Sequence, residues 1–221
     1  MTMPGTAPLD DAPVRPRLRG VIHRYASVVF AAGFVALVVA GDAADRPWLA
    51  VYGLAVTTML AVSAVYHSGR LSPVAQAVCK RIDHSTILLA IAGSYTGIVG
   101  LGLEGSSRTR MLVLVWILAG IGMAIRMLWL HAPYPVVAVV YVAVGWVALI
   151  DVGALADGLT GTELALVVLG GVLYSVGAAV YALHAPNPWP ATFGYHEVFH
   201  TMVVLAAAVH LVAVASLVAS G

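Results

Sequence analysis

The feature that most limits how this chain can fold is a series of long apolar stretches. Of its 221 residues, 61% are hydrophobic and only 10% are charged, whereas globular domains carry roughly 25% charged residues. A membrane span needs about 20 mostly apolar residues, and seven such stretches follow one another. They cover residues 21–41, 47–67, 83–103, 111–130, 135–155, 163–184 and 196–219. The sequence therefore predicts an all-α integral membrane bundle of seven transmembrane helices.

The segments between these stretches are short, so no separate soluble domain is expected. Residues 1–20 form a basic amino-terminal segment, and residues 21–221 form a single seven-helix transmembrane domain. The formal net charge is only +1, and no basic patch indicates a nucleic-acid partner. The single cysteine, Cys79, excludes an internal disulfide bond and a Cys-rich metal site. Membrane lipids are the expected partners, and nothing in the sequence predicts an oligomeric state.

The distribution of Arg and Lys predicts the orientation, because these residues are enriched in cytoplasmic connections. Only three of them fall on the side opposite to the amino terminus, namely Arg46, Arg108 and Arg110. The other eight fall on the amino-terminal side: Arg15, Arg17, Arg19, Arg24, Arg70, Lys80, Arg81 and Arg126. We therefore expect a multi-pass protein of the cell membrane with a cytoplasmic amino terminus and an external carboxyl terminus.

Three spans that are far apart in the sequence bring polar side chains to one membrane depth on the cytoplasmic side. They are Ser63 and His67 at the inner end of the second span, Asp83 at the start of the third, and His196 and His200 at the start of the seventh. Ionisable residues inside spans are costly and mark candidate functional sites. The topology thus predicts one shared site rather than scattered polar residues.

The residue types and their spacing favour a zinc site. His196 and His200 are four residues apart, so their rings project from one helix face. His67 would complete a three-histidine set that leaves a fourth position for water, as catalytic zinc sites do. Asp83 would orient or deprotonate this water, and Ser63 would hydrogen-bond to His67 or to a substrate. Bound zinc lowers the pKa of water to about 7, which makes a nucleophile available at neutral pH.

Several of these residues also have a purely structural interpretation. Asp83 would serve equally well as a helix cap or ion-pair partner, and Ser63 would bond back to a carbonyl one turn earlier. His84 points about 100° away from Asp83 on a helix and is expected at the interface. His23 lies near a span end, where a solvated histidine needs no special role. Arg126 is expected to extend its charge to the membrane surface.

The string HEVFH, from His196 to His200, also matches the H-E-x-x-H signature of zinc metalloproteases. Those enzymes need a third ligand downstream, but no Glu follows and the position for a third His is Ala206. An intramembrane metalloprotease would need an Asp from another span, for which Asp83 is the best candidate. Glu197 is expected at the cytoplasmic boundary rather than at an attacking water.

Four segments carry a resemblance to a known family: "AVSAVYHSGR", "RIDHSTILLAIAGSYTG", "GGVLYSVGAAVYAL" and "FGYHEVFH". With them the chain resembles the hemolysin III family, a bacterial branch related to the progestin and adipoQ receptors and to the alkaline ceramidases. The resemblance covers nearly the whole chain and implies seven spans with the amino terminus inside. It departs at "LRGVIHRYASVVF", which has His23 but lacks the Glu and Asn that many bacterial members carry before a Thr-His pair.

The resemblance also implies a site: zinc bound near the cytoplasmic face by His67, His196 and His200, with Asp83 touching the zinc-bound water and Ser63 near the reacting centre. Our leading hypothesis is a zinc-dependent hydrolase that acts from the cytoplasmic leaflet on a lipid amide or ester held between the helices. In this hypothesis Asp83 positions or deprotonates the water and Ser63 steadies the developing oxyanion. One alternative is a receptor-like or membrane-homeostasis protein with structural zinc. Another is a pore-forming cytolysin, although the spans show no strongly polar face that would line a channel.

Overall fold

A computed structural model describes residues 16–67, 71–129 and 132–221, and it confirms the all-α bundle. Within these ranges, seven helical segments are long and apolar enough to cross a membrane. The fifth segment, Tyr134–Gly158, is broken into α5 (Tyr134–Gly145), a 3-10 turn (Val147–Asp151) and α6 (Val152–Gly158). The other six are α1 (Val21–Ala40), α2 (Arg46–Tyr66), α3 (Pro73–Gly102), α4 (Gly105–Leu128), α7 (Gly161–Leu183) and α8 (Tyr195–Ser220). Most of the basic segment 1–20 lies outside the described residues.

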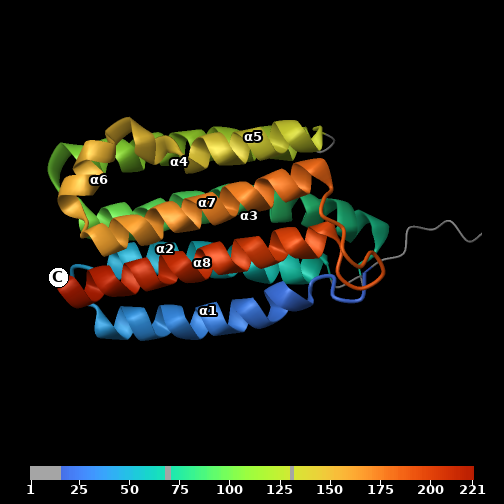
Figure 1. Cartoon of the computed structure of the whole chain (residues 1–221), viewed down its shortest axis with the longest axis horizontal. Coiled ribbons are helices and arrows are strands. Elements are labelled where there is room, and N and C mark those ends of the chain that lie inside the picture. Colours follow the sequence, from blue (N-terminus) through green and yellow to red (C-terminus); the bar gives the residue numbers. More distant parts are fainter. Residues whose placement is uncertain (1–15, 68–70, 130–131) are drawn as a thin grey trace, which may run out of the picture.

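The helices run side by side along the long axis of the molecule (Figure 1). α2, α3 and α4 form one row and α8, α7 and α5 form a second, while α1 packs against both α2 and α8 at one edge. α3 lies at the centre, with 67% of its apolar window buried, compared with 17% for α1. Large apolar side chains that face outward, such as Val28, Val29 and Leu128, suit contact with lipid, because lipid tails are as apolar as these side chains.

Small residues let α2 and α3 approach closely. A Cβ atom placed on Gly93 would lie 2.3 Å from Cβ of Ala55, and one on Gly97 would lie 2.9 Å from Cβ of Tyr52. Glycine at such positions allows helix backbones to pack together inside a membrane. This contact packs the first half of α2 against the second half of α3, so the two helices are held close together away from the histidine end.

The start of α3 differs from the prediction. The helix begins at Pro73, ten residues before the expected start of the span, and the Ser72 side chain caps it by accepting a hydrogen bond from the Ala75 N–H. Its 30 residues extend about 45 Å, which exceeds the roughly 30 Å hydrocarbon core. The expectation that Asp83 opens the helix was therefore wrong, because Asp83 lies in its third turn and cannot be the cap.

Polar contacts join the chain at both ends of α8. At the inner end, the N–H groups of Arg17 and Leu18 donate to the carbonyl oxygens of Ala191 and Thr192, in the connection before α8. At the outer end, the buried Glu163 carboxylate of α7 accepts hydrogen bonds from Ser216 at 2.9 Å and from Ser220 at 3.4 Å. α8 is thus attached to other parts of the bundle at both membrane faces.

Candidate metal centre

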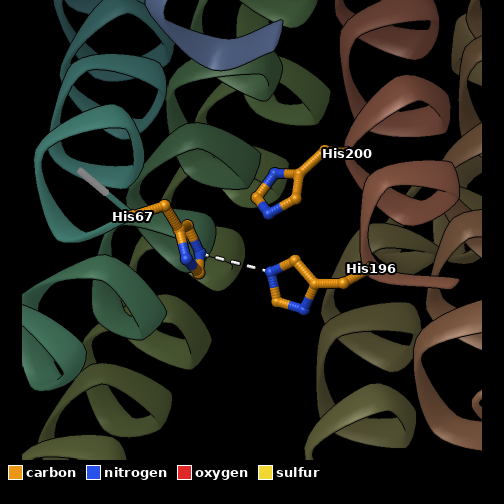
Figure 2. Close-up of side chains that lie close together, drawn as sticks. All are labelled: His67, His196 and His200. Carbon is orange, nitrogen blue, oxygen red and sulfur yellow. Dashed lines mark hydrogen bonds between the residues drawn. The ribbon is translucent and has the colours of Figure 1, made fainter. Parts of the chain in front are cut away.

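Three histidines converge at the inner end of the bundle (Figure 2). His67 directly follows the last residue of α2, while His196 and His200 lie in the first two turns of α8. One ring nitrogen from each lies within 4.8 Å of the others, and Nε2 of His67 is 3.2 Å from Nε2 of His196. His67 and His200 are buried, and His196 is half-buried. The structure therefore brings the three expected ligands together.

The separation of His67 and His196 matches that of two ligands of one metal ion. Tetrahedral zinc with Zn–N bonds of about 2.0–2.1 Å places two ligand nitrogens roughly 3.3 Å apart, close to the 3.2 Å between His67 and His196. An N–H···N hydrogen bond would also explain that contact. It would not explain His200, whose buried Nε2 lacks a hydrogen-bond partner among the described residues. Burying an unpaired polar nitrogen is costly, and metal coordination would remove this cost.

Asp83 and Ser63 lie beside the histidine trio. Oδ2 of Asp83 is 4.0 Å from Nε2 of His67, and the Ser63 hydroxyl is within hydrogen-bonding reach of the Asp83 carboxyl group. Asp83 is 6% exposed and Ser63 is 2% exposed. Ser63, which was expected to hydrogen-bond to His67 or to a substrate, also lies beside the Asp83 carboxyl group. The Asp83 carboxylate thus lies between Ser63, which can hydrogen-bond to it, and the candidate metal ligand His67.

His23 belongs to this cluster, which the sequence interpretation missed. It is buried, and its Nε2 lies 2.8 Å from Nδ1 of His200. The two rings meet edge to face, with centroids 3.9 Å apart. The expectation of a solvated side chain was wrong, because α1 packs against α8 at this depth. Its position could have indicated this role. His23 is the third residue of the first span, which begins on the cytoplasmic side in the predicted topology, so it lies at the same depth as the other polar side chains.

Glu197 has a structural partner rather than a place at the histidines. Its carboxylate is 1% exposed and forms an ion pair with Nε of Arg19 at 2.5 Å. The backbone N–H of Gly194 donates to the same carboxylate at 2.9 Å. Because both oxygens are engaged at the start of α8, Glu197 is poorly available as a base. This contact removes the main support for the protease interpretation.

Arg126 and His84 form a second buried pair at the same end of the bundle. Arg126 is 4% exposed, and its guanidinium donates to Nδ1 of His84 and to the carbonyl oxygen of Trp129. The hydroxyl of Tyr141 donates to the carbonyl oxygen of His84. Arg126 therefore does not extend to the membrane surface, because its partners lie on α3 and at its own helix end.

A long apolar cavity leads away from the histidine trio between α3, α5, α7 and α8. It begins at Ser63, His67 and Asp83, and it also touches both His196 and His210. The last two residues are 14 positions apart on α8, so the cavity extends about 21 Å along the helix. Its walls are mainly apolar side chains such as Ile91, Val142 and Val203. The histidine trio and Asp83 thus lie at one end of a mainly apolar space whose length suits a hydrocarbon chain.

The seven spans and the histidine trio together define the class of this protein: it is a multi-pass membrane protein with a candidate metal centre. Residues 12–211 match the family described as Haemolysin-III related, so the chain belongs to the haemolysin III family. It is 29% identical over 177 residues to the protein named Hemolysin-3 homolog from Bacillus subtilis (strain 168), which covers 80% of this chain and 77% of that protein. It is also 29% identical over 154 residues to the protein named Hemolysin-3 from Bacillus cereus, covering 70% and 67%.

Proposed function

We propose that this protein is a zinc-dependent hydrolase of the cell membrane that cleaves an amide or ester bond of a lipid. The observation that carries the proposal is the position of Asp83, 4.0 Å from the His67 ring nitrogen, at the polar end of the apolar cavity. Lipid hydrolysis by a metal enzyme requires a general base, a metal site and room for an acyl chain. Asp83, the histidine trio and the apolar cavity would supply these three.

Each polar residue at this end of the cavity has a separate role in the proposed reaction. His67, His196 and His200 hold the ion, and bound zinc supplies Lewis acidity that polarises a carbonyl group and acidifies water. Asp83 accepts a proton from the attacking water while the water oxygen bonds to the carbonyl carbon. Asp83 then gives that proton to the departing nitrogen or oxygen. Ser63 positions the Asp83 carboxylate through the contact described above.

The cavity determines which substrates fit. It extends about 21 Å along α8, whereas each leaflet of the hydrocarbon core is about 15 Å thick. A long acyl chain would therefore lie in it with its carbonyl group at the histidine end. The apolar walls favour a lipid over a peptide, because a peptide would bury unpaired backbone groups there.

Replacing Asp83 with Asn separates catalysis from metal binding. We expect Asp83→Asn to keep one zinc ion per chain and to lower lipid hydrolysis about 10²- to 10⁴-fold, the range that general acid–base catalysis contributes. Purified protein in lipid nanodiscs would be incubated with a lipid extract, and released fatty acids would be measured by mass spectrometry. Zinc would be measured on the same samples.

Asp157→Asn is the matched control, since Asp157 is an exposed carboxylate outside the polar end of the cavity. Asp157→Asn should change neither the zinc content nor the rate of lipid hydrolysis. His200→Ala should lose both the zinc and the activity. If Asp83→Asn hydrolysed lipids as fast as the unmodified protein, the proposal would be wrong. Zinc that affects only thermal stability, without any hydrolysis, would instead support the receptor-like alternative with structural zinc.

A further inference from the structure

A second, polar cavity adjoins the histidine trio on the side away from the apolar cavity; we call it the vestibule. The two cavities share four wall residues, namely His67, His84, Tyr181 and His196. The vestibule is also lined by Arg19, Lys80, Gln76 and the tyrosines Tyr66, Tyr134 and Tyr195. A molecule whose chain lies in the apolar cavity would therefore place its polar end here.

The vestibule is lined by hydrogen-bond donors and by positive charge. Lys80 and Arg19 contribute cationic groups, and no Asp or Glu is among its lining residues in the described ranges. Arg19 is paired with Glu197 through Nε, so the guanidinium keeps donors on its two terminal nitrogens. Lys80, half-buried on α3, has no ion-pair partner among the carboxylates that the structure describes.

The buried Arg126 fixes how His84 faces the vestibule. A guanidinium group only donates, so its contact with Nδ1 of His84 makes that nitrogen the acceptor. The proton of the neutral ring must then lie on Nε2. His84 thus adds a further N–H donor to the wall that separates the two cavities. The charge of Arg126, directly behind it, adds to the positive potential.

From this arrangement we propose that the vestibule binds the anionic group of an amphiphile, a phosphate or carboxylate, whose acyl chain occupies the apolar cavity. This inference rests on the proposed function in placing the reacting bond at the histidine trio, and it deepens that function by making the substrate class anionic lipids. Lys80, Arg19 and His84 would recognise the anion, because charge-assisted hydrogen bonds to phosphate and carboxylate are the strong ones.

The test compares two soluble probes with the same short acyl chain: an acylglycerol phosphate and the corresponding uncharged acylglycerol. Binding would be measured by isothermal titration calorimetry in non-ionic detergent, with the zinc-loaded Asp83→Asn protein as the background for every variant, so that the ester probes are not cleaved. We expect the phosphate probe to bind about tenfold more tightly, which corresponds to one favourable charged contact. Lys80→Gln should abolish that preference and Lys80→Arg should retain it. The preference should also weaken as the salt concentration rises.

Arg24→Gln is the matched control. It removes the same charge from an exposed residue near the same end of the bundle but outside the vestibule lining, and it should leave the preference unchanged. Equal binding of the two probes, or equal effects of Lys80→Gln and Arg24→Gln, would overturn the inference. Inorganic phosphate that binds as tightly as the acylated probe would also overturn it, because the chain would then contribute nothing.

The two proposals can fail separately. Selective binding of the anionic probe without hydrolysis of any lipid would retain the vestibule assignment and defeat the hydrolase. Hydrolysis of lipids with no preference for the anionic probe would retain the hydrolase and defeat the vestibule assignment.

Discussion

At the scale of single residues, the contact between His23 and His200 is the one most open to test. Nδ1 of His200 lies within hydrogen-bonding distance of the His23 ring, and Nε2 of His200 lacks a hydrogen-bond partner in the part of the chain that the structure describes. A histidine that binds a metal through one nitrogen generally donates its other N–H to a neighbouring acceptor, which orients the ring. His23 therefore has the position of an orienting acceptor for His200.

We expect His23→Ala to weaken zinc binding about 10- to 100-fold, the usual cost of losing such a partner. Competition with a chromogenic chelator would give the affinity. His23→Gln, which keeps an acceptor, should recover much of it, whereas loss of packing alone would not be repaired in this way. An unchanged affinity in His23→Ala would rule out the orienting role.

At the scale of structural elements, the segment before α1 supports the metal centre through its backbone. Gly20 has a φ of 78°, and a Cβ atom at this residue would lie 2.8 Å from Cβ of His67. Glycine is required twice here, once for the left-handed conformation and once for the close approach. The entry to α1 is therefore packed directly against a candidate ligand on another helix.

Gly20→Ala should consequently displace His67 and lower zinc affinity. Gly105→Ala provides a matched control, because Gly105 also has a positive φ, of 61°, but nothing lies within 4 Å of its Cβ position. Both variants carry the roughly 1–2 kcal/mol cost of a left-handed alanine, and only Gly20→Ala should change metal binding. Chelator competition would measure zinc affinity and thermal melting would measure stability for both variants. Together they distinguish the backbone strain that both share from the clash with His67 that only Gly20→Ala introduces. Equal zinc affinities would contradict the expectation.

At the scale of the whole molecule, the metal would link α2 to α8, the second helix to the last. We expect chelation to lower the melting temperature of the purified protein by about 10 °C, since a ligand at 1,000 times its Kd stabilises by about 4.1 kcal/mol. Differential scanning fluorimetry with and without chelator would measure this, and His200→Ala should already melt at the lower temperature. No difference between the zinc-loaded and chelated protein would argue against such a link.

Much of this architecture could be predicted from the sequence, because apolar stretches of span length carry a strong signal. The convergence of His67, His196 and His200 followed from their shared depth and the i, i+4 spacing. The start of α3 at Pro73 could not be predicted from apolar length, since that helix continues beyond the hydrocarbon core. The roles of His23, Arg126 and Arg19 depend on which helices are neighbours. That information lies in side-chain packing rather than in hydropathy.

The two attachments of α8 also determine how the protein meets bilayers of different thickness. At one face Arg19 pairs with Glu197 of α8, and at the other Ser216 and Ser220 of α8 donate to Glu163 of α7. A helix anchored at both ends cannot slide or tilt independently of its neighbours. Hydrophobic mismatch would then be absorbed by the surrounding lipid, which thins or thickens around the bundle, and the spacing of His196 and His200 from His67 would stay constant from one membrane to another.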